Sequence, residues 1–125
     1  MEKKRIIIVD TTSDSFLILK AMFPAYDIHL AADLSEMIEL LIEHKKHIAL
    51  MILNCDALPD SHWNLALKRL STFFPNIRLM ACTQSAEKQI QIKHYAIDSI
   101  LDELIVHKES VFNAISNALT KIVRP

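Results

Sequence analysis

The sequence predicts an α/β fold in which helices cover both faces of a parallel five-stranded sheet. Short apolar, β-branched runs alternate five times with segments whose apolar residues recur every three or four positions. The short runs are mainly apolar and do not alternate between polar and apolar residues, which is typical of parallel strands buried on both faces. Right-handed crossovers between five such units in 125 residues favour the flavodoxin-like strand order 2-1-3-4-5.

Length and composition limit the class of protein. A chain of 125 residues fits one domain over residues 1–125. Its 51% hydrophobic content and net charge of −1 argue against disorder, and they give no reason to expect direct nucleic-acid or membrane binding. Its apolar runs, such as residues 48–53, are far shorter than the ~20 residues that cross a bilayer. We therefore expect a cytoplasmic domain.

The absence of glycine excludes two kinds of nucleotide site. Loops that wrap closely around phosphate need residues without a β-carbon, so that backbone N–H groups can approach the anion. Neither a Walker loop nor a dinucleotide fingerprint can be written without glycine.

The first half of the chain is expected to hold three strands and two helices. The strands are Arg5–Val9, residues 26–30 and residues 48–53. Residues 10–13 are small and polar, so they can turn the chain into a first helix with apolar positions between Phe16 and Phe23. Asp33 and Glu36 resemble a capping box at the start of a second helix with an apolar stripe over residues 34–42.

The second half is expected to continue the alternation. Pro59 and Asp60 open a helix that Pro75 ends, and a strand follows over residues 77–82. The expected buried face of that helix comprises Trp63, Ala66, Leu67, Leu70 and Phe73, with Phe73 and Phe74 dividing between core and rim. A short helix over residues 86–95, a brief strand Ser99–Leu101 and a last helix with its stripe over residues 111–122 complete the pattern.

The expected topology places a site at one edge of the sheet. In the order 2-1-3-4-5, strands 1, 3 and 4 end side by side where the direction of winding reverses, and ligand sites in such sheets lie there. The residues at these ends are Asp10, residues 54–56 and Thr83.

At these strand ends the sequence resembles the receiver domain of two-component response regulators, over essentially the whole chain. The resemblance rests on residues 6–10, residues 50–59 and residues 74–83, taken in order. It implies a signalling module of a phosphorelay, with Thr83 at the position where the family keeps a switch Ser or Thr.

The resemblance fails at positions that carry the chemistry of the family. Receivers usually have two acidic residues after strand 1, the second of which contacts Mg²⁺, whereas this chain has Asp10 and Thr11. The phospho-accepting Asp usually stands four residues before a proline. Counting back from Pro59 gives Cys55, and allowing one inserted loop residue gives Asn54.

Two further positions depart from the family. Its Lys after strand 5 is replaced by Glu103, and its aromatic switch residue by Ile100. Phosphoryl transfer needs a metal held by carboxylates and positive charge near the phosphoryl oxygens. We therefore expect a degenerate receiver, or pseudo-receiver, with no catalytic residues, no bound metal and no cofactor, which is not an enzyme and acts by protein–protein contact.

Two alternatives remain open at this point. Asp56 is the phospho-acceptor if the loop is one residue shorter than usual, and Asp10 and Asp56 would then be the ligands of Mg²⁺. A small flavodoxin-like thiol enzyme or phosphocarrier would use Cys55, although no Lys, Arg or His lies within four residues of Cys55 to activate it. A disulfide switch between Cys55 and Cys82 competes with the simpler interpretation of two small buried residues.

The resemblance also implies where partners bind. Receivers use the side formed by helix 4, strand 5 and helix 5, here including residues 94–111, to contact a protein partner or output domain. A homodimer through the same side is an alternative.

Overall fold

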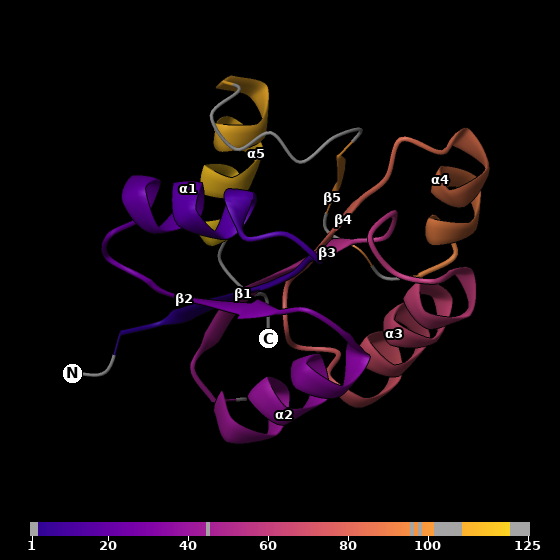
Figure 1. The fold of residues 1–125 in the computed structure, drawn as a ribbon, viewed down its shortest axis with the longest axis horizontal. Helices are drawn as coiled ribbons and strands as arrows, with labels where there is room; N and C mark the ends of the chain where they lie inside the picture. Colours follow the sequence, from indigo (N-terminus) through magenta and orange to yellow (C-terminus); the bar gives the residue numbers. More distant parts are fainter. Residues whose placement is uncertain (1–2, 45, 96, 98, 102–108, 121–125) are drawn as a thin grey trace.

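The computed structural model describes residues 3–44, 46–95, 97, 99–101 and 109–120, and it shows a parallel sheet between two layers of helices (Figure 1). The strand order β2-β1-β3-β4-β5 is the predicted one. The strands are β1 (Arg5–Val9), β2 (Asp27–Ala31), β3 (Ile48–Asn54), β4 (Leu79–Cys82) and β5 (Ser99–Leu101). The helices are α1 (Asp14–Met22), α2 (Leu34–His44), α3 (Asp60–Phe73), α4 (Ala86–Ile92) and α5 (Glu109–Thr120).

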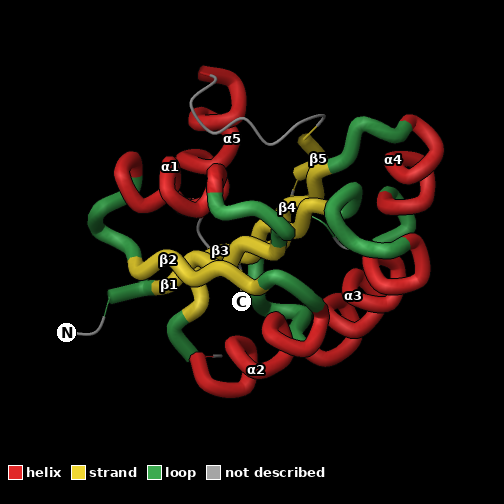
Figure 2. The backbone as a smooth tube through the Cα atoms, viewed as in Figure 1, coloured by secondary structure: helices red, strands yellow, loops and turns green. Residues whose placement is uncertain are grey.

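The apolar residues of the strands form two hydrophobic cores, one on each face of the sheet. The helices that cover the two faces are seen in Figure 2. Successive side chains of a strand point to opposite faces. Ile6 and Ile8 of β1 therefore pack with residues of α1 and α5, while Ile7 and Val9 pack with residues of α2, α3 and α4. This two-sided burial is the physical reason that consecutive residues of β1, β3 and β4, and not only alternate ones, are apolar.

The bounds of β2 and the end of β3 differ from the sequence prediction by one residue, and two other boundaries differ by more. β4 begins at Leu79, two residues later than expected, because Ile77 donates its N–H to Phe74 O in a turn. α4 ends at Ile92, because the N–H groups of His94 and Tyr95 bond to carbonyls three residues back, as in a tightened final turn. The end of the predicted last helix beyond residue 120 lies outside the described residues.

The buried face of α3 is confirmed at Trp63, Ala66, Leu67 and Leu70. The expectation that Phe73 is also buried is wrong, since its side chain is 70% exposed. Phe74 packs against the core instead, because it lies four residues after Leu70 and so continues the same helical stripe.

The backbone turns without left-handed residues. No described residue has a positive φ angle. The start of α2 shows how side chains help: Asp33 accepts the N–H of Glu36 at 2.9 Å, and the carboxylate of Glu36 accepts the N–H of Ala32 at 2.7 Å. These two bonds form the expected capping box, except that Glu36 accepts the N–H of Ala32 where a standard capping box would use the N–H of Asp33. None of the helices in the described part of the chain is long and apolar enough to span a membrane.

Candidate functional site

Four of the predicted site residues meet at the carboxyl edge of the sheet, where β1 and β3 end. They are Asp10, Thr11, Asn54 and Asp56, and they line a cavity of about 480 Å³, called here the acidic cavity. Asp14, at the start of α1, and Gln84, after β4, add to its wall. Parallel strands bring the residues that follow them to one edge, so this grouping follows from the topology.

Asp10 is buried, and hydrogen bonds satisfy its carboxylate. Oδ1 accepts the N–H groups of Thr11 at 2.7 Å and Thr12 at 3.3 Å, and Oδ2 accepts the side-chain amide of Asn54 at 3.2 Å. Asn54 uses its other end as well, because its Oδ1 accepts the N–H of Asp56 at 3.3 Å. The two side chains therefore tie the end of β3 to the loop that follows β1.

Asn54 and Cys55 point to different sides of the sheet. Asn54 lines the acidic cavity, whereas Cys55 is fully buried in the core that α2, α3 and α4 cover. Cys55 directly follows β3 and still pairs with β4, because its N–H donates to Cys82 O at 2.9 Å, so the alternation of the strand extends to it and only one of the two successive side chains faces the cavity. Of the two positions that counting back from Pro59 left open, only Asn54 faces Asp10.

Asp56 is the centre of a set of contacts, called here the Asp56 network, that also includes Thr83, Gln84 and Lys88. Its Oδ1 accepts the Thr83 hydroxyl at 2.7 Å and the Lys88 ammonium at 3.2 Å. Its Oδ2 accepts the N–H of Gln84 at 2.8 Å. Both carboxylate oxygens are thus occupied by donors from the end of β4 and from α4.

Lys88 brings a cation to the site, and the sequence reasoning missed it. Its Nζ also lies 3.4 Å from Cys55 O, 3.6 Å from Asp60 Oδ1 and 5.7 Å from the centre of the Trp63 ring. Lys88 is distant in sequence from the loop after β3, so a search for cations near Cys55 along the chain did not find it. The fold could have indicated Lys88, because the helix after β4 begins at the carboxyl edge of the sheet and its first turn lies close to the loop after β3.

Electrostatics favour the ionised form of Asp56. Partial burial raises the pKa of its carboxyl, but hydrogen bonds from Gln84, Thr83 and Lys88, with the charge of Lys88, outweigh burial and lower that pKa below its ordinary value. The side chain keeps 36% exposure. Asp56 is therefore a charged acceptor that its neighbours hold in place.

The two cysteines have the environment of core residues. Burial, opposed in part by the charge of Lys88, raises the pKa of the Cys55 thiol to about 12. Cys82 lines the acidic cavity beside Asn54, its partner across the sheet, while Cys55 lies in the core on the other face. Neither cysteine forms a disulfide, and their placement on opposite faces does not bring the two thiols together for one.

The donors around the acidic cavity do not fit Mg²⁺. The ion requires several oxygen ligands in octahedral geometry. The Asp10 carboxylate already accepts three hydrogen bonds, Asn54 turns its amide nitrogen toward it, and the ammonium of Lys88 is bound to Asp56. No group of three or more His, Cys, Asp or Glu side chains in the described residues is arranged to hold a metal ion.

The remaining predicted site residues lie around this cavity or beyond it. Thr83 is fully buried behind Asp56, and its Oγ1 accepts the N–H of Ser85 at 3.1 Å. Ile100 lies in β5 beside Ala81 and packs against the core on the side of α2, α3 and α4. Glu103 lies outside the described residues.

Comparison with known proteins identifies the fold. The sequence matches no protein-family model, and no curated protein matches it significantly. Solved receiver domains, however, superpose on almost the whole chain. The CheY-like response regulator receiver domain protein from Methanospirillum hungatei does so with a TM-score of 0.77 at 20% identity, covering 94% of each chain.

Two more receiver domains support the same assignment. The non-phosphorylated HemR receiver domain from Leptospira biflexa has a TM-score of 0.80 at 16% identity, covering 98% of each chain. The signal receiver domain of an HD domain-containing protein from Pseudomonas fluorescens has a TM-score of 0.76 at 20% identity, covering 94% of this chain and 95% of that one. The chain therefore has the fold of response regulator receiver domains, and its function must be argued from its own site.

Proposed function

We propose that this domain is a signalling module that acts by protein–protein contact without aspartyl phosphorylation. The observation that carries the proposal is the Asp56 network. A phospho-acceptor must present a carboxylate oxygen to the incoming phosphorus, but both oxygens of Asp56 accept hydrogen bonds from Thr83, Gln84 and Lys88. Asn54, which faces Asp10 across the cavity, has no carboxylate to offer.

The same network supports a fixed conformation. If Thr83 is the counterpart of the switch residue of receivers, the Asp56 carboxylate already holds its hydroxyl at 2.7 Å. Gln89 of α4 donates to Thr83 O at 3.2 Å, and Ser85 caps the start of the same helix. In this proposal a permanent negative charge on Asp56 takes the place of a transient phosphoryl group and keeps α4 in one position.

We assign the contact surface to the side formed by α4, β5 and α5. Lys88 and Gln89 anchor α4 to the site, while the next residue, Ile90, is 64% exposed. An exposed Ile on a rigid helix can serve as an apolar contact for a protein partner. The partner is an output domain or another protein, or a second copy in a homodimer. Two cysteines that form no disulfide fit a cytoplasmic protein.

The test of the proposal is an attempt to phosphorylate the chain. The protein is incubated with Mg²⁺ and acetyl phosphate and then with Mg²⁺ and beryllofluoride, beside a receiver that has a complete acidic pocket. We expect no adduct in intact mass spectra, no bound fluorine signal and unchanged amide NMR spectra. The reference receiver should show all three changes.

A stoichiometric adduct that Asp56→Asn abolishes would contradict the proposal and establish the alternative, an atypical phospho-acceptor in a phosphorelay with Mg²⁺ as cofactor. The position of Asp56 on the cavity wall, with 36% of its side chain exposed, is what this alternative has in its favour. The other alternative, a thiol enzyme or phosphocarrier using Cys55, has less support, since that thiol is fully buried and its pKa is raised to about 12.

The fixed position of α4 has a separate test. Lys88→Met removes the charge that links α4 to Asp56, and we expect it to lower the free energy of unfolding by about 1 kcal/mol and to shift the amide signals of Thr83 and α4. Lys93→Met, at the exposed end of the same helix, is the matched control and should change neither. Equal effects of the two substitutions would show that Lys88 does not hold the helix.

A further inference from the structure

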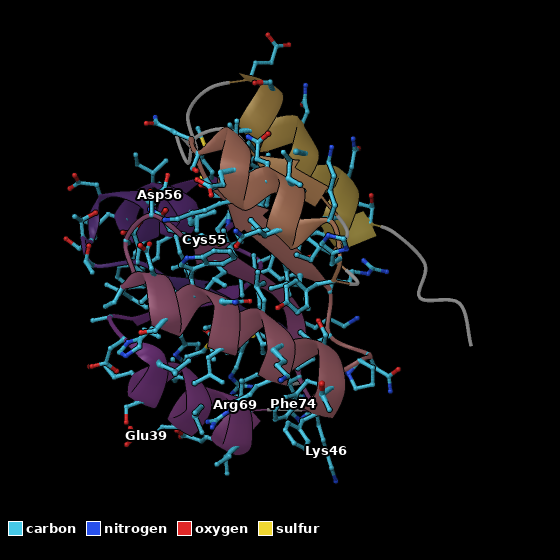
Figure 3. The ribbon with its side chains drawn as sticks, turned by 90° about the vertical axis from the view of Figure 1, so that its right-hand side faces the viewer. Glu39, Lys46, Cys55, Asp56, Arg69 and Phe74 are labelled. Carbon is cyan, nitrogen blue, oxygen red and sulfur yellow. The ribbon has the colours of Figure 1, made fainter. Side chains whose placement is uncertain are left out.

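A second cavity lies at the opposite edge of the sheet, where the strands begin. It has a volume of about 430 Å³ and is called here the basic cavity. Its wall includes residues that directly precede four strands. They are Lys4 before β1, Tyr26 before β2, His47 before β3 and Arg78 before β4. Figure 3 shows Lys46, another wall residue, far from Asp56 and therefore at the other end of the molecule.

The basic cavity has strong positive charge. The wall includes the basic side chains of Lys4, Lys46 and Arg78, and the lining residues include no Asp or Glu. Within the part of the chain that the structure describes, none of these three side chains has an ion pair. Three like charges around one hollow repel one another, so a bound anion would relieve a repulsion that the described residues leave in place.

One of the cations is also held in position. The Nη1 of Arg78 donates to Ala118 O near the end of α5, which fixes the guanidinium group at the cavity wall. Among the described residues no other partner of this guanidinium is found, so its remaining N–H groups can bind an anion. Neutral hydrogen-bonding groups complete the wall, because Tyr26, Asn76 and Thr120 lie on it. A planar guanidinium with flexible ammonium groups beside it is the combination that binds phosphate oxygens well.

We propose that the basic cavity is a binding site for a small soluble phosphate anion, either a phosphate ester or a polyphosphate. The proposal is independent of the function of the acidic cavity, because the two cavities share no residue. The cavity would bind the anion at several points, because Lys4, Lys46 and Arg78 can each donate a charge-assisted hydrogen bond to one of its negative oxygens.

The test is a titration with inorganic pyrophosphate, followed by amide NMR at constant ionic strength. We expect saturable shifts confined to the amino edge of the sheet, with a dissociation constant of about 1 mM or tighter. The double substitution of Lys4→Gln and Lys46→Gln should weaken binding about tenfold or more. Lys68→Gln, which neutralises an exposed lysine of α3, is the matched control and should leave binding unchanged.

Three outcomes would overturn the proposal. They are shifts that do not saturate, shifts that sodium chloride reproduces at the same ionic strength, and equal weakening by the Lys68→Gln control. The lysine variants must give wild-type amide spectra away from the cavity before their affinities are compared. Arg78→Lys provides an independent check, because it keeps the charge but loses the planar fork. We expect it to weaken pyrophosphate binding about threefold to tenfold.

Discussion

At the scale of single residues, the charge of Lys88 decides what the carboxyl edge of the sheet can do. An ammonium group at 3.2 Å stabilises a negative charge on Asp56 that Thr83 and Gln84 also bind. The replacement of the family's Lys by Glu103 stays a prediction, because Glu103 lies outside the described residues. Asp56 nevertheless has a cation beside it, which α4 supplies.

The lowered pKa of Asp56 makes part of the stability depend on pH. The unfolded carboxyl has an ordinary pKa of about 3.9, and the folded one lies below it, so the stabilisation is complete at neutral pH and is lost as the pH falls below about 4. In Asp56→Asn this loss should be absent. The difference in the free energy of unfolding between wild type and variant should be largest at neutral pH and shrink on acidification, as measured by urea denaturation.

Glu39→Gln is the control for this series. Glu39 is an exposed carboxylate of α2, well away from Asp56 (Figure 3). The role given to Asp56 would be contradicted if the difference in the free energy of unfolding between wild type and Asp56→Asn stayed constant from neutral pH to pH 3. It would also be contradicted if the difference between wild type and Glu39→Gln shrank equally.

His29 predicts a second pH effect, in a different range. Burial, the nearby His44 and the charge of Arg5 lower the pKa of His29, against the opposing charges of Asp27 and Glu43. The folded protein thus disfavours the protonated imidazole, whereas the unfolded chain protonates near pH 6.5. Stability should therefore fall as the pH drops below about 6.5, down to the folded pKa.

The measurement is the free energy of unfolding at a series of pH values from 7.5 to 5, spanning the ordinary histidine pKa. His29→Gln should flatten this dependence, while His62→Gln, at an exposed position of α3, should keep it. If the pH dependence of the free energy of unfolding persisted in His29→Gln, a titrating group other than His29 would be its cause.

Single residues also show why the site was only partly predictable. Asp10, Thr11, Asn54 and Asp56 were found because a parallel sheet gathers the residues at its strand ends. The orientation of Asn54 and Cys55 depended on one loop residue, which counting along the chain could not fix. Lys88 was missed because its contacts depend on the angle of α4 and not on any motif.

At the scale of the elements, α4 is the clearest link between local sequence and site. It has only seven residues, and it is capped by Ser85, whose Oγ accepts the N–H of Lys88 at 3.2 Å. So short a helix has little stability of its own, so its cap and its contacts with Asp56 and Thr83 must hold it. The cap and the charge of Lys88 act on the same turn.

Substitution of this cap should be measurable. Ser85→Ala removes the acceptor for the Lys88 N–H, and we expect it to lower the free energy of unfolding by about 1 kcal/mol. Ser13→Ala is the matched control, since Ser13 occupies the same position before α1 without a side-chain cap bond, and it should cost less than about 0.5 kcal/mol. Equal costs in thermal or urea unfolding would show that the cap of α4 is not special.

The elements themselves were predicted well where local signals are strong. β1, β5 and α3 have the expected bounds, because apolar runs and prolines mark their ends. β4 and α4 differ by a few residues because backbone hydrogen bonds at Ile77, His94 and Tyr95 end them, and these bonds have no signature in side-chain chemistry.

At the scale of the whole molecule, β1 and β3 form the centre of the sheet, and β2 and β5 form its edges. The strand order was predictable because parallel strands need right-handed crossovers and because the strands are apolar on both faces. Composition also excluded glycine-based nucleotide sites. The basic cavity was not predictable, since its wall joins residues that precede four separate strands.

The position of each strand predicts its rate of hydrogen exchange. The strands β1, β3 and β4 are each paired on both sides and most of their residues are buried, so their amides should exchange only on global unfolding and be the slowest among the described residues. Amides of β2 and β5 should exchange faster through local opening. Amide hydrogen exchange followed by NMR at several denaturant concentrations measures these rates. An edge strand whose amides were as protected as those of β3 would contradict the prediction.

The placement of charge along the strand direction has a consequence for encounters in solution. Asp10, Asp14 and Asp56 lie at one end of the molecule and Lys4, Lys46 and Arg78 at the other, although the net charge is only −1. Such a separation gives the domain an electric dipole that turns it before it touches a charged surface, within a Debye length of about 8 Å at physiological salt. An approaching partner therefore meets an already aligned molecule, and added salt should slow that meeting.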